Sequence, residues 1–76
     1  MPALPVLSGQ QMVSILERLG WTVARRRGSH IVMTKEGHIA TLSIPNHREV
    51  AKGTLRSIVR SAGLPLDEFL AAIDRY

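Results

Sequence analysis

The tripeptide Gly28-Ser29-His30, which directly follows Arg25-Arg26-Arg27, is the segment of this sequence best suited to chemistry. An imidazole can exchange a proton near neutral pH. Clustered guanidinium groups can hold a phosphate through paired hydrogen bonds. Together these groups suggest phosphodiester chemistry on a nucleic acid, with His30 transferring the proton. The alternative is a histidine that only makes a structural hydrogen bond on a sheet face.

The positive charge of the chain is concentrated around this segment. The 76 residues contain ten Lys and Arg and six Asp and Glu, which gives a formal net charge of +4. The stretch 19–35 contains no acid and four of the bases, namely Arg25, Arg26, Arg27 and Lys35. Such a segment favours a polyanion or an acidic protein as partner. A solvated surface that keeps a small protein soluble is the alternative.

Length and composition predict one small domain over residues 1–76, with residues 1–7 as an extended N-terminal arm. The chain has no Cys, so neither a disulfide nor a thiolate metal site can supplement its core. No segment approaches the roughly 20 apolar residues that cross a bilayer. Residues 1–7 also lack the basic start and long apolar run of a secretory signal. We therefore expect a cytoplasmic protein that does not contact membranes.

A helix is predicted at the start of the chain. Ser8 and Gln11 have the spacing of a capping box. Apolar residues then recur at helical intervals from Met12 to Leu19, which defines one apolar face. Gly20 is expected to end the helix, because glycine adopts the left-handed conformation at no steric cost.

Three strands are predicted next, because the hydrophobic period changes to two. Gly28-Ser29 and residues 35–38 are expected to form the turns. Sequential strands joined by short turns pair as an antiparallel meander. The predicted strands cover residues 21–27, 30–34 and 39–44.

Two further helices are predicted after a loop over residues 47–52. Gly53-Thr54 opens the first of them, with Thr54 as its expected cap, and Gly63 ends it. Pro65 is expected to start a short final helix. The resulting fold is α+β, in the order α-β-β-β-α with a short C-terminal helix. Helices then cover one face of a three-stranded antiparallel sheet, and the other face stays open for a ligand.

The order of elements resembles that of double-stranded-RNA-binding domains, and the motifs resemble those of the HicA family of small bacterial and archaeal toxins. The similarity extends from about residue 8 to residue 69. The matching stretches are Leu19-Gly20-Trp21, Arg25, Gly28-Ser29-His30, Pro45 with His47, Gly53-Thr54-Leu55 with Ile58, Ala62-Gly63-Leu64, and Glu68-Phe69.

This resemblance implies an activity, a catalytic residue and a partner. HicA proteins are ribonuclease toxins that cleave messenger RNA and so arrest translation, and a cognate antitoxin, HicB, inhibits them. The catalytic histidine of the family maps to His30. The chain departs from the family at Ile31, where many members have a second histidine, and at Lys52, which often is proline. A mechanism with two adjacent imidazoles is therefore not available.

Cleavage of RNA without a metal or another cofactor removes a proton from the 2′-hydroxyl, which then attacks the adjacent phosphorus. We expect His30 to transfer this proton. The amides of the Gly28-Ser29 turn could approach the phosphate, or Gly28 could simply be a glycine of a hairpin or bulge. Arg25 and Arg27 are expected on one face of their strand and Arg26 on the other. The full set of expected RNA-binding residues is Arg25, Arg26, Arg27, Gly28, Ser29, Lys35, Lys52, Arg56 and Arg60.

The remaining histidines and the tryptophan have structural interpretations. His38 and His47 lack the additional ligands that a metal site needs, so no metal is expected. His47 matches a family position and could contact RNA or the antitoxin, or simply hold its loop. Trp21 is expected in the core, with base stacking as the alternative.

Two other functions compete with a nuclease. The same fold and basic surface would suit an RNA-binding module without catalytic activity. A DNA-binding helix-turn-helix after Gly53 is disfavoured, because its second helix has few polar residues that could contact bases. We therefore expect mRNA as substrate, a HicB-type antitoxin that covers the face of His30, and no DNA contact by this chain alone.

Overall fold

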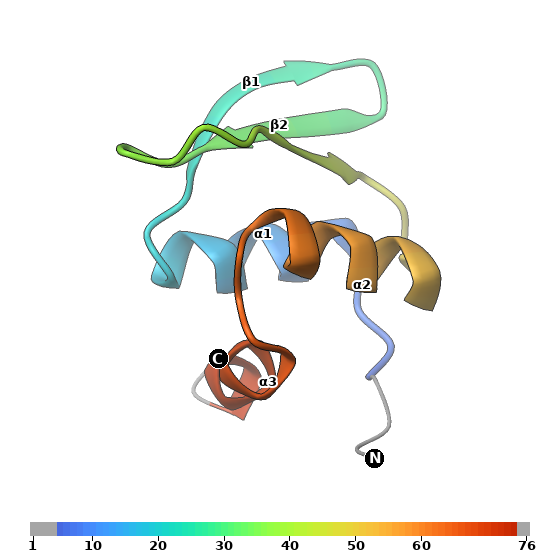
Figure 1. Cartoon of the computed structure of the whole chain (residues 1–76). Helices are drawn as coiled ribbons and strands as arrows, with labels where there is room; N and C mark the ends of the chain where they lie inside the picture. Colours follow the sequence, from blue (N-terminus) through green and yellow to red (C-terminus); the bar gives the residue numbers. More distant parts are fainter. Residues whose placement is uncertain (1–4, 75–76) are drawn as a thin grey trace.

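The computed structural model describes residues 5–74. A three-stranded sheet lies above two helices, and a third helix packs beneath them (Figure 1). This confirms the predicted α+β fold. The first four residues of the predicted N-terminal arm lie outside the described residues. The elements are α1 (Gly9–Arg18), β1 (Thr22–Arg27), β2 (His30–Thr34), β3 (Leu42–Pro45), α2 (Lys52–Ser61) and α3 (Leu66–Asp74).

The sheet is the predicted antiparallel meander, in the order β1-β2-β3. Its inner face carries Ile31 and Met33 of β2, which are fully buried against the helices. Residues between them point the other way, because side chains alternate along a strand. His30, Val32 and Thr34 therefore lie on the outer face, which no described helix covers.

An irregularity in β1 decides which of its arginines share that outer face. Val23 pairs with Met33 on the inner side, but the next paired residue is Arg25, which lies opposite Val32. Ala24 is thus an extra residue, a β-bulge that reverses the alternation of β1. Without it, Arg25 and Arg27 would face inward and only Arg26 would face outward.

The first helix begins as the sequence predicts. The Ser8 hydroxyl accepts a hydrogen bond from the Gln11 amide at 3.1 Å, and the Gln11 side chain accepts one from the Ser8 amide at 2.9 Å. This capping box satisfies two amides that have no partner within the helix. Gly20, with φ of +100°, follows the end of α1 and leads the chain into β1.

Two predicted boundaries are wrong. The third strand begins at Leu42, not at residue 39, and Ile39 is fully exposed in the long connection from β2. The helix α2 begins at Lys52 and not at Thr54; its N-cap is Ala51, which has no side-chain cap. Just before α2, Val50 is buried and donates its amide to the Leu7 carbonyl at 2.8 Å.

The core lies between the inner face of the sheet and the helices. Helix α1 packs on β1 and β3, α2 packs on β3, and α3 packs on both helices. Phe69 of α3 is completely buried, and Trp21 is 2% exposed, as predicted for a core residue. The Trp21 ring contacts His38, with 5.0 Å between centroids. Its indole N–H has no hydrogen-bond partner in the described part of the chain.

No helix within residues 5–74 combines the length and the apolar character needed to cross a membrane.

Candidate functional site

His30 is the first residue of β2 and is exposed on the outer face of the sheet. It lies opposite Arg27 of β1 on one side and Pro45 of β3 on the other. Side chains that are directly opposite on neighbouring strands have Cβ atoms about 5 Å apart. The imidazole and the Arg27 guanidinium can therefore reach the same phosphate group.

The second outward arginine extends this cationic surface along β1. Arg25 lies opposite Val32, two residues along β2 from His30. Arg26 lies opposite the buried Ile31, on the inner side of the sheet, although its own side chain reaches solvent. The structure therefore brings together His30, Arg25 and Arg27, and separates Arg26 from them.

The turn that joins β1 to β2 consists of Gly28 and Ser29. Gly28 has φ of +59°, and no residue other than glycine has a positive φ in the described part of the chain. A positive φ at the first turn residue followed by a negative one is typical of a type II′ hairpin, which favours glycine first. Both residues are exposed, and no atom lies within 4 Å of the position that a Cβ of Gly28 would occupy. This leaves the turn accessible beside His30.

The loop after β3 fastens this turn to the first helix. The Asn46 amide donates to the Ser29 carbonyl at 2.7 Å, and the Gly9 amide donates to the His47 carbonyl at 2.9 Å. A Cβ at Gly9 would overlap the Pro45 carbonyl oxygen and lie 2.9 Å from the Asn46 Cα. The close approach of α1 to β3 thus requires glycine there. The main chain of His47, and not its imidazole, makes the hydrogen bond that holds the loop.

Four of the expected RNA-binding cations lie away from His30. Lys35 follows the far end of β2, and its aliphatic end lies beside Gly20. Lys52 opens α2 on the covered side of the sheet. Arg56 and Arg60 line a hollow of about 270 Å³ with Val59, Leu64 and Leu66, on the side of α2 nearest the α2–α3 loop. The structure thus separates the α2 cations from the face that carries His30.

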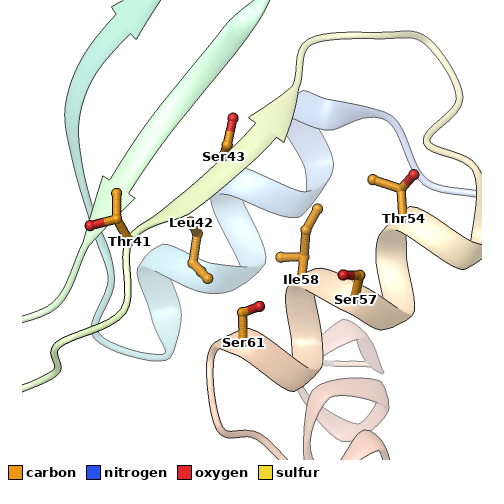
Figure 2. Close-up of a pocket in the computed structure, with 7 residues that line it drawn as sticks. All are labelled: Thr41, Leu42, Ser43, Thr54, Ser57, Ile58 and Ser61. Atoms are coloured by element: carbon orange, nitrogen blue, oxygen red, sulfur yellow. The ribbon is translucent and has the colours of Figure 1, made fainter.

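A groove that the sequence analysis missed runs between β3 and α2. It has a volume of about 190 Å³. Residues with hydroxyl groups line both walls, with the apolar side chains of Leu42 and Ile58 between them (Figure 2). The spacing of hydroxyl residues at i, i+3 and i+7 on α2 is a sequence signal that could have indicated it. The hydroxyl-bearing residues are Thr41, Ser43, Thr54, Ser57 and Ser61.

The histidines do not combine into a metal site. His38 lies beside Trp21, and its Nδ1 accepts a hydrogen bond from the Ala40 amide at 3.1 Å. Within residues 5–74, no three His, Asp or Glu side chains converge in a way that could hold an ion. None of the three strands contains an acidic residue.

Comparisons with known proteins identify one family and one similar solved structure. The model of the family described as the HicA toxin of bacterial toxin-antitoxin matches residues 9–64. A solved structure described as a toxin-antitoxin complex from Streptococcus pneumoniae contains a chain that is 39% identical, with a TM-score of 0.68. That similarity covers 76% of this chain and 98% of the other. No curated protein matches the chain.

Proposed function

Because the chain belongs to the HicA toxin family, we propose that this toxin is a metal-independent endoribonuclease that cleaves mRNA. The observation that carries the proposal is the outer face of the sheet. There His30 is exposed and lies opposite Arg27. Arg25 lies opposite Val32, two residues along β2 from His30. These side chains combine a proton-transfer group with two phosphate-binding groups on an open surface.

Each group has a distinct part in the reaction. The His30 imidazole takes the proton of the 2′-hydroxyl while the 2′-oxygen attacks phosphorus and the bond to the 5′-oxygen breaks. Arg25 and Arg27 hold the non-bridging oxygens, whose negative charge increases as the phosphorane forms. The exposed Gly28-Ser29 turn can add amide donors. The 5′-oxygen leaves with a proton, and the products are a 2′,3′-cyclic phosphate and a free 5′-hydroxyl.

The face supplies only one evident acid-base group. Since no strand contains an acid and Ile31 is buried, water or the protonated His30 must supply the proton for the 5′-oxygen. One positioned acid-base group contributes about 10²–10⁴-fold to a rate. We therefore expect a slow nuclease, whose activity would still be harmful to a cell.

The same open face suits inhibition by an antitoxin. We propose that a HicB-type antitoxin places an acidic surface over His30, Arg25 and Arg27 and so excludes RNA. The similarity to a chain of a toxin-antitoxin complex supports such a partner. Charge attraction of this kind raises association rates mainly at low salt.

The test is cleavage of a structured RNA in the presence of EDTA by three proteins: wild type, His30→Ala and His38→Gln. We expect wild type and His38→Gln to cleave, and His30→Ala to bind the RNA without cleaving it. His38 is a suitable control because it is a histidine on the connection to β3, beside Trp21. Binding without cleavage by all three proteins would favour an RNA-binding module instead. Cleavage by His30→Ala would exclude His30 as the catalytic residue.

A further inference from the structure

We propose that the groove between β3 and α2 binds the base and ribose of the nucleotide next to the scissile phosphate of single-stranded RNA. The inference rests on the proposed function, because it names a second subsite for the same substrate. The groove is lined by Thr41, Leu42, Ser43, Thr54, Ser57, Ile58 and Ser61 (Figure 2).

The groove is continuous with the face that carries His30. Ser43 lies opposite Val32 and therefore belongs to the outer face, and it also lines the groove. His30 and Ser43 are on neighbouring strands and two residues out of register. With a strand spacing of about 4.8 Å and a rise of about 3.4 Å per residue, their Cα atoms are about 8 Å apart. One extended nucleotide can span that distance.

The free edge of β3 provides backbone groups at the mouth of the groove. The Asn46 amide donates to the Ser29 carbonyl, in register with the β2–β3 pairs. Hydrogen-bonded pairs alternate along antiparallel strands, so Leu42 and Ile44 bond to β2 while Ser43 does not. Because β3 is an edge strand, the Ser43 N–H and C=O point away from the sheet toward solvent. They can pair with a polar edge of a base.

The lining of the groove suits a base and a ribose better than a phosphate. Five of its seven residues carry hydroxyl groups and none is charged. Those hydroxyls make no hydrogen bond to another residue within the described range 5–74. A hydroxyl both donates and accepts, and so matches the polar edges of a base and the oxygens of a ribose.

The size and floor of the groove favour a single base. Its volume of about 190 Å³ is smaller than the roughly 300 Å³ of ordinary ligand pockets. The floor is formed by Leu42 and Ile58, which are nearly buried and offer an apolar surface to the face of a base. This volume suits one base better than a base pair, so we expect the nucleotide to come from an unpaired strand.

The test measures binding of a 2′-O-methyl oligonucleotide, which cannot undergo attack by its own 2′-oxygen, so the readout does not depend on cleavage. The variant is Ser57→Ala with Ser61→Ala, and the control is Ser14→Ala on α1. Ser57 and Ser61 are exposed on a helix, where alanine is favourable, so the variant should fold. We expect the double variant to bind about tenfold more weakly, the loss of two hydrogen bonds. Ser14→Ala should bind as wild type does.

A set of oligonucleotides with one abasic position each then locates the contact. If the groove holds one base, a single abasic position weakens binding to wild type, and at that position the double variant loses less affinity than wild type does. The subsite proposal would be overturned if wild type and the double variant bound the oligonucleotide equally. It would also be overturned if an abasic site caused the same loss of affinity at every position of the oligonucleotide. A double variant that binds RNA normally but fails to bind the antitoxin would assign the groove to a protein instead.

The outcomes separate the two proposals. Wild type that binds RNA but does not cleave an unmodified strand would overturn the nuclease, and the abasic series would still decide the subsite. Wild type that cleaves, with a double variant that binds normally, would overturn the subsite alone. Wild type that binds no RNA would overturn both.

Discussion

His30 is held in place by its backbone and not by a partner side chain. Its imidazole makes no hydrogen bond to another residue in the range 5–74. In enzymes with a catalytic triad, a carboxylate orients the histidine and selects its tautomer. If His30 transfers a proton as proposed, the substrate phosphate and the neighbouring Arg27 orient its ring. Because no described side chain fixes the orientation of the imidazole, we expect only modest catalysis.

The Gly28 position provides a test of the turn beside His30. Replacing Gly28 with alanine forces a Cβ into a conformation with φ of +59°. We expect the free energy of unfolding to fall by about 1–2 kcal/mol, although no atom would collide with the new Cβ. Chemical denaturation of wild type and variant measures it.

Gly53→Ala is the matched control, since that glycine lies in α2 with ordinary φ and with nothing within 4 Å of an added Cβ. It should leave stability unchanged or raise it by up to about 1 kcal/mol. An equal effect of both substitutions would contradict the account of the turn.

At the scale of elements, sequence patterns predicted every helix and strand but not every boundary. The capping box located the start of α1 because it is a local signal that depends on two side chains. The start of α2 has no side-chain cap, so no local signal of that kind marks it, and the residue before its N-cap is held by a long-range hydrogen bond to Leu7. Ile39 looked like a strand residue by type, yet it is fully exposed in a connection.

The bulge at Ala24 is the element-scale feature that most affects the site. The motif around His30 predicted the catalytic candidate, and the opposite faces of Arg25 and Arg26 followed from alternation. Whether His30 shares its face with Arg25 or with Arg26 depends on the one extra residue of the bulge. No feature of residues 21–27 indicates that bulge. The groove was missed for a related reason, because its two walls are far apart in the sequence.

Substitution of adjacent arginines tests the orientation that the bulge produces. Arg27→Ala removes a cation from the outer face, and Arg26→Ala makes the same charge change on the inner side. If RNA lies on the outer face, Arg27→Ala should lower the slope of log K against log salt by about 0.7. Arg26→Ala should lower it much less. Binding to a single-stranded oligonucleotide at several salt concentrations gives both slopes, and a larger change for Arg26 would place the RNA elsewhere.

At the scale of the whole molecule, stability depends on a core that closes only when all three helices are present. Chains of this size bury about 60% of the surface that their unfolded state exposes, which leaves little reserve. Phe69 of α3 is completely buried among residues contributed by the rest of the fold.

Phe69→Ala should therefore cost about 3–5 kcal/mol, a large part of the total stability of a small domain. We expect loss of a cooperative unfolding transition, or a strongly lowered midpoint, in thermal denaturation followed by circular dichroism. Ile39→Ala removes a fully exposed apolar side chain and should change stability by less than about 0.5 kcal/mol. A Phe69→Ala variant as stable as wild type would show that α3 is dispensable.

The order of the elements along the chain also sets when the molecule can become harmful during its synthesis. His30 and the outward arginines lie within the first half of the chain, so they leave the ribosome early. The inner face of the sheet that carries them has no complete cover until α2 has followed. If this face is the active one, as proposed, the toxin gains it only after α2 has been made, and the interval before then allows an antitoxin already present to bind.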